Sequence, residues 1–128
     1  MLEPGRELDA AVARHVFGYE FQPLTGGKGY CEHCGRVFQG YNDYYNLKKF
    51  CQGRCRYSID DDAAWAVVRA MREKGFAVSM GWTDDDALEQ TYLSVVVFTG
   101  TNGRGNGTEK SFPHAVCVAT LMALGVEL

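Results

Sequence analysis

Four cysteines are the residues of this sequence best placed to do chemistry. They form two pairs with the spacing Cys-x2-Cys-x16-Cys-x3-Cys, namely Cys31, Cys34, Cys51 and Cys55. A short turn can aim both thiolates of a pair at one metal, and four thiolates complete the tetrahedral shell of Zn²⁺. Because such a closed site has no position for water, we expect the zinc to stabilise the fold rather than to activate a nucleophile.

Two disulfides, or four unrelated thiols, are the alternatives to zinc. Disulfides need an oxidising compartment, and residues 1–10 have neither the basic start nor the apolar run of a signal peptide. No apolar stretch approaches the roughly 18 residues of a membrane span. We therefore expect a soluble cytoplasmic protein with no membrane partner.

The charge of the chain is unevenly distributed. The 128 residues carry a net charge of −3, yet residues 28–57 hold six basic and two acidic side chains, giving +4 against −7 for the rest. A Zn²⁺ ion with four thiolates adds two negative charges, which lowers the segment to about +2. This correction weakens the case for a nucleic-acid partner, although the aromatic side chains among these cations could stack on bases.

Three tyrosines between the cysteine pairs are candidate contacts for a partner protein. Tyr41, Tyr44 and Tyr45 lie in QGYNDYYN, just before Lys48 and Lys49. Exposed tyrosines supply rigid, amphipathic area at protein interfaces. The same tyrosines could instead form the core of the metal-binding segment.

The elements around this segment follow from periodicity and capping. Helices are predicted over residues 4–17 and 59–74, the first ending at Gly18 and including His15 in its apolar stripe, the second capped by Ser58. Alternation predicts a strand over residues 76–82. The nearly all-apolar residues 92–98 predict a central strand buried on both faces, and a helix over residues 113–124 closes the chain.

A glycine-rich run, residues 100–107, precedes the last helix. We expect a flexible loop turning at Asn106-Gly107, followed by a short edge strand over residues 108–111. Gly103, Arg104 and Gly105 could then bind a nucleotide or another phosphate through backbone donors and the guanidinium. The run is not a Walker A loop, because no Gly-Lys-Ser/Thr follows four variable residues.

No arrangement of residues indicates catalysis. The three histidines have no neighbouring nucleophile and orienting acid suggested by spacing. His114 and Cys117 share a face of the last predicted helix, but the segment is strongly apolar. We therefore expect Cys117 to be a small core residue. We expect the protein not to be an enzyme.

The order of these pieces resembles the phage ABA sandwich domain family, small proteins of phages and prophages. The similarity rests on Val16-Phe17-Gly18-Tyr19, on YSIDDDAAW at residues 57–65 with Asp60 at the motif's aspartate, and on the Pro-led last helix. It covers most of residues 6–22 and 57–128. It implies an α+β fold, an α/β sandwich of about three helices on a small antiparallel sheet. It does not imply any particular activity.

Residues 28–57 depart from the family pattern. We interpret them as a zinc-knuckle insertion within a single domain of residues 1–128. The sequence thus predicts a non-enzymatic phage or prophage protein of the host cytoplasm, stabilised by zinc, that docks on a host or phage protein and inhibits a defence system. The alternatives are a binder that sequesters a nucleotide signal through residues 100–107 and a zinc-dependent nucleic-acid-binding module. The oligomeric state is open.

Overall fold

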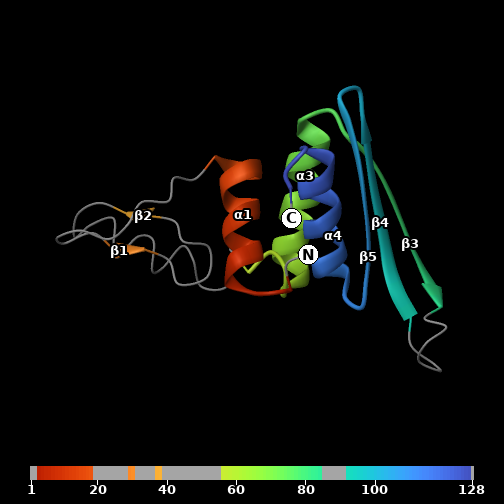
Figure 1. The fold of residues 1–128 in the computed structure, drawn as a ribbon, viewed down its shortest axis with the longest axis horizontal. Coiled ribbons are helices and arrows are strands. Elements are labelled where there is room, and N and C mark those ends of the chain that lie inside the picture. The colour runs from red at the N-terminus through yellow and green to blue at the C-terminus, as the bar shows by residue number, and fades with distance from the viewer. Residues whose placement is uncertain (1–2, 19–28, 31–36, 39–55, 85–91, 128) are drawn as a thin grey trace.

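The computed structural model describes residues 3–18, 29–30, 37–38, 56–84 and 92–127. In these ranges three α-helices lie over one face of a three-stranded antiparallel sheet, and two short strands pair separately (Figure 1). The predicted α+β sandwich is therefore confirmed.

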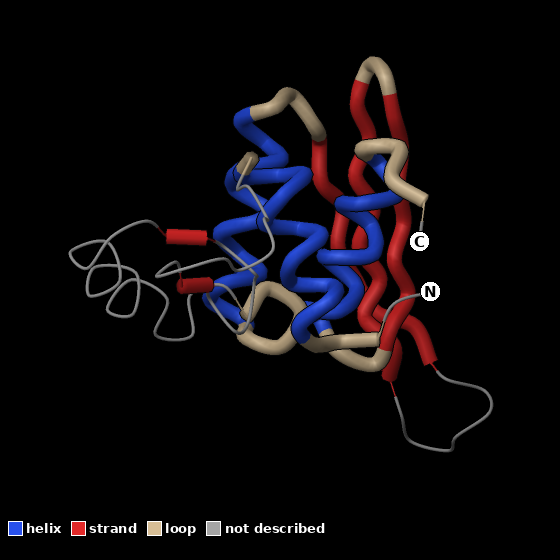
Figure 2. Tube along the Cα trace, turned by 60° about the vertical axis from the view of Figure 1, so that its left-hand side comes forward, coloured by secondary structure: helices blue, strands red, loops and turns tan. Residues whose placement is uncertain are grey.

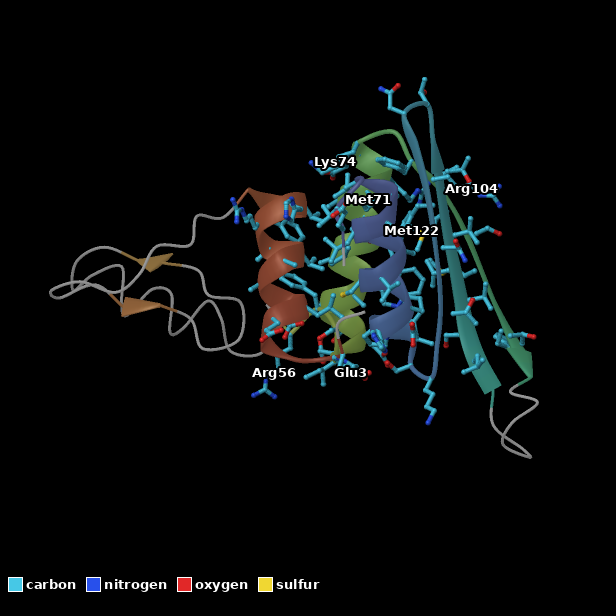
Figure 3. All side chains as sticks on the ribbon, in the orientation of Figure 1. Glu3, Arg56, Met71, Lys74, Arg104 and Met122 are labelled. Carbon is cyan, nitrogen blue, oxygen red and sulfur yellow. The ribbon has the colours of Figure 1, made fainter. Side chains whose placement is uncertain are left out.

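The three helices are parallel to one another. They are α1 (Arg6–Phe17), α3 (Asp61–Glu73) and α4 (Phe112–Ala123). Glu3 and Arg56, which precede α1 and α3, lie at the same end of the molecule, whereas Lys74, after α3, lies at the opposite end (Figure 3). The positive ends of three helix dipoles therefore gather at one end, where the acidic residues of the first turns of α1 and α3 also lie.

Helix α4 is the centre of the molecule. It contacts β4 and β5 on one side and α1 and α3 on the other, and its residues from Pro113 to Leu121 are all buried. A helix that is covered on every side must be apolar all round. This requirement explains why the segment reads FPHAVCVATLMA rather than showing an amphipathic pattern.

The sheet has the order β3 (Ala77–Asp84), β4 (Tyr92–Gly100), β5 (Gly103–Glu109). The central position predicted for residues 92–98 is correct. The side chains of Val96 and Phe98 are fully buried under the helices. The alternate residues Leu93, Val95 and Val97 are only half-buried, because no described element covers that face (Figure 2), and the predicted burial on both faces was wrong.

The caps of α1 and α3 agree only in part with the predictions. Gly18 ends α1 in the left-handed conformation, at φ 72°, as expected. Helix α3, however, is capped by Asp60, whose carboxylate accepts the Ala63 N–H at 2.9 Å. The prediction that Ser58 caps this helix was wrong, since Ser58 has another partner. His15 is exposed and does not belong to the apolar stripe of α1.

Candidate functional site

The predicted metal ligands and contact residues lie outside the described residues: Cys31, Cys34, Cys51, Cys55, Tyr41, Tyr44, Tyr45, Lys48 and Lys49. The described parts of the segment are β1 (Gly29–Tyr30) and β2 (Val37–Phe38), which pair antiparallel, Gly29 with Phe38 and Tyr30 with Val37. Tyr30 and Val37 therefore lie about one strand spacing apart, roughly 4.8 Å.

The glycine-rich run is a strand and not a loop. Residues 103–109 form β5 in continuous register with β4, from Ser94 opposite Glu109 to Gly100 opposite Gly103. The chain reverses at Thr101-Asn102, so the predicted turn at Asn106-Gly107 was wrong. The edge strand predicted over residues 108–111 exists, but it begins at Gly103 and ends at Glu109. The glycines recur every second residue, and this period places them all on one face of the strand.

That face lies directly under α4. A Cβ added at Gly103, Gly105 or Gly107 would come within 2.0–2.2 Å of a carbonyl oxygen of α4, those of Ala123, Ala119 and Ala115 respectively. Two strand residues advance about 6.6 Å and four helical residues about 6.0 Å. The spacing of the glycines along β5 therefore nearly equals the spacing of the alanines along α4. Glycines at every second residue of β5 and alanines at every fourth residue of α4 thus allow the two backbones to touch at three successive glycine–alanine contacts.

This arrangement removes the loop on which the nucleotide alternative was based. Gly103 and Gly105 are used for packing against α4, and Gly105 is buried. Arg104 points away from the helices, toward the open face of the sheet (Figure 3). The Arg104 guanidinium and the close contact of the glycines with α4 therefore lie on opposite faces of the sheet.

A buried polar cluster joins the starts of α1 and α3, and the sequence analysis did not find it. The carboxylate of Asp9 accepts two hydrogen bonds through Oδ1, from the Ser58 backbone N–H at 2.7 Å and from the Ser58 hydroxyl at 2.6 Å. The Ser58 Oγ in turn accepts the Gly5 N–H at 2.9 Å. Both side chains are essentially buried, Asp9 at 1% and Ser58 at 0% exposure.

The cluster stabilises the fold, and because it is buried a substrate cannot reach it. Burying a carboxylate is costly unless it is hydrogen-bonded, and Ser58 supplies two of the bonds. Gly5 can take part because it adopts φ 146°, a conformation that side chains disfavour. The sequence signal that could have revealed the cluster is an aspartate next to Leu8 on the buried side of α1.

The thiol of Cys117 is fully buried on α4, as predicted. Its pKa is raised well above the ordinary value, first by burial and second by the nearby charge of Asp9. A protonated, inaccessible thiol is a poor nucleophile. The other buried polar groups of α4 are His114, whose Nδ1 lies 3.5 Å from Glu109, and Thr120.

Within the described residues, no group of three or more histidines, cysteines or acids is arranged to hold a metal ion. The same residues contain no helix that is both long and apolar enough to cross a membrane.

Large apolar side chains are exposed at several points of the surface: Ile59, Trp65, Met80, Trp82 and Met122. Trp65 packs against Phe112, with ring centroids 5.1 Å apart and the ring planes tilted by 44°. Trp82 is the most exposed of them, at 77%, and it lies on β3 together with Met80 at 40%. Two of the five thus belong to one edge strand.

The layered fold, with its buried hydrogen-bonded cluster and its exposed apolar edge, defines a small α+β sandwich protein. The chain belongs to the phage ABA sandwich domain family, whose model matches residues 10–121. The resemblance stated from the sequence is therefore confirmed, while the inserted zinc module stays a prediction.

The fold is similar to that of a solved structure, the 2.0 Å crystal structure of a phage protein from Bacillus cereus ATCC 14579. It is 21% identical, with a TM-score of 0.57, over 96% of this chain and 93% of that chain. None of the curated proteins is a significant match.

Proposed function

We propose that this protein is a phage-encoded interaction protein without catalytic activity, stabilised by Zn²⁺, that docks on a host protein and inhibits it. A defence system of the bacterial host is the target class we favour, because phages keep small accessory proteins for that purpose. The site of action is then the host cytoplasm.

Support comes from how the described side chains are distributed. Asp9, Ser58 and Cys117, which could serve in catalysis, are buried and help to hold helices together. Large apolar side chains, with Trp82 the most exposed, are at the surface. This is the distribution of a binding module, whose affinity comes mostly from aromatic and apolar anchors.

Support for the zinc comes from the β1–β2 pair. It brings together the residues on either side of segment 31–36, which contains Cys31 and Cys34. Four thiolates from two such turns would close the metal shell and would present the tyrosines between them on a small rigid module.

A plating assay tests the function. The protein is expressed in bacterial strains that each carry one defence system, and the efficiency of plating of a sensitive phage is measured. We expect the parent chain to restore plating on at least one strain, and the triple change Tyr41→Ser, Tyr44→Ser, Tyr45→Ser to abolish the effect at equal expression and zinc content.

The proposal fails if no strain in a broad panel regains plating. Loss of zinc or solubility in the triple variant would mean that the tyrosines are structural.

A further inference from the structure

Strand β3 is an edge strand of the described sheet, and up to its last residue, Asp84, it has no charge, proline or bulge to protect it against pairing. It is eight residues long, it has no other described strand beside it, and its register with β4 is continuous from Ala77 to Asp84, without a bulge. Residues 77–83 contain no charge and no proline. Natural edge strands are normally blunted by lysine, proline, a bulge or short length.

The helix-facing side of β3 becomes progressively uncovered along the strand. Phe76 and Val78 pack against the core, whereas Met80 is 40% and Trp82 77% exposed. Trp82 lies opposite Ser94 on β4, whose small side chain covers little of the indole. The half of β3 beyond Val78 therefore presents an apolar row next to a free strand edge.

We propose that β3 pairs antiparallel with β3 of a second copy of this chain, about a two-fold axis perpendicular to the sheet and passing near Met80. Directly opposite residues of antiparallel strands share a face. Val78 of each copy then lies opposite Trp82 of the other, and Met80 lies opposite Met80. The two sheets become one continuous sheet with all helices on the same side.

The strand is self-complementary in this register. On the helix side, an aromatic residue meets a β-branched one twice, a favourable cross-strand pair. On the open side, Ala77 meets Thr83 and Ser79 meets Gly81, so no bulky side chains collide. Because residues 77–83 are uncharged, pairing brings no like charges into contact even though the chain is net negative.

The exposed side chains of β3 supply part of the area that a dimer needs. A tryptophan can bury roughly 150–250 Å², so two indoles exposed at 77% supply on the order of 300 Å². Specific interfaces begin at about 1,200 Å² in total. The rest of the buried area would come from the two Met80 side chains and from the backbone edges of the two eight-residue strands. These backbone edges become buried only if the strands pair along their whole length.

Light scattering after size exclusion, over a range of concentrations, tests the assembly with the full-length chain. We expect twice the chain mass at high concentration. Trp82→Lys should raise the dissociation constant roughly 100-fold or more, since each dimer loses two buried indoles. Met122→Lys is the matched control: it changes another exposed apolar residue, on α4, and should leave the mass unchanged. A chain that is monomeric at all concentrations, or a Trp82→Lys variant that dimerises like the parent, overturns the proposal.

Hydrogen exchange identifies the interface independently of any substitution. Amides of residues 77–83 should become more protected as the concentration rises, because the free edge of β3 acquires partners. A dimer whose β3 protection does not change with concentration pairs through another surface and also overturns the proposal. Neither measurement involves a host target, so failure here leaves the proposed function standing.

Discussion

At the residue scale, three glycines decide how the sheet and its central helix meet. Gly103, Gly105 and Gly107 have no side chain, and α4 lies against them with Ala115, Ala119 and Ala123. In each glycine a Cα–H bond points toward a helix carbonyl in the place of a Cβ, a weak but repeated interaction. The glycines are therefore packing residues, and their backbone freedom is incidental.

Gly105→Ala should strongly destabilise the protein. The new methyl group would come 2.0 Å from the Ala119 carbonyl oxygen and 2.4 Å from the Ala123 nitrogen, and backbone atoms of a central helix cannot move aside cheaply. We expect a loss of about 3 kcal/mol or more of unfolding free energy, at the upper end of overpacking costs. Urea denaturation followed by circular dichroism measures it.

Gly81→Ala is the matched control for that substitution. Gly81 lies on β3 in the same sheet, and a Cβ there would have nothing within 4 Å. Its effect should stay within about 0.5 kcal/mol, because alanine restricts the unfolded chain without a clash. Equal losses from the two variants would contradict the close packing of β5 on α4.

Cys117 should make stability fall at alkaline pH. Its pKa is raised in the folded state by burial and by Asp9, so its contribution is complete below the unfolded value near 9.0 and is lost as pH rises toward the folded value. The limiting slope is about 1.4 kcal/mol per pH unit. Urea denaturation of the parent and of Cys117→Ala from pH 7.5 to 10 should show the parent declining more steeply above pH 9. Parallel curves would mean that the thiol ionises as easily in the folded chain.

At the element scale, the motif residues that carry the family resemblance are the contacts between helices. Phe17 stacks on Tyr57 with ring centroids 5.2 Å apart, and Ser58 binds Asp9. Asp60 caps α3, and Trp65 of α3 packs at a tilt against Phe112 at the start of α4. The motif thus encodes the assembly of the helical layer and gives no reason to expect a shared activity.

Ser58→Ala should loosen the junction between α1 and α3. It removes the hydroxyl that donates to Asp9 and accepts from Gly5, and leaves a buried carboxylate with fewer donors. We expect a loss of about 1–3 kcal/mol, the cost of a buried polar group without its partner. Thermal unfolding measures the change, and Ser79→Ala, an exposed serine on β3, should be nearly neutral. Equal small effects would show that the cluster contributes little.

Most of the elements could be predicted from the sequence, because periodicity and caps are local signals. The stripe of α3, the end of α1 at Gly18 and the central position of β4 follow from them. The glycine strand could not be predicted in this way, since alternating glycines look like a loop until a helix is placed over them. Ser58 was misassigned because a serine before a helix satisfies the local pattern of a cap, and only the fold brings Asp9 to it.

At the scale of the whole molecule, the helices and the sheet have a core of their own. In the described part of the chain, that core is drawn from α1, Tyr57, α3, β4 and α4. We expect zinc, if it binds the cysteine segment, to stabilise the residues around its ligands most directly. Removing the metal should affect that segment first and leave the packing of α4 on β5 in place.

Native mass spectrometry of chains purified without chelator should therefore show one Zn²⁺ per chain, and none after Cys51→Ser with Cys55→Ser. Hydrogen exchange should then show lost protection at Gly29–Tyr30 and Val37–Phe38, which pair across the first cysteine pair, with the amides of α4 and β5 unchanged. This separation follows because a structural metal stabilises the residues that its ligands hold together. Metal-free parent chains lighter by four hydrogens would indicate two disulfides and would overturn both the zinc site and the cytoplasmic assignment. Global loss of protection would mean that the metal supports the entire fold.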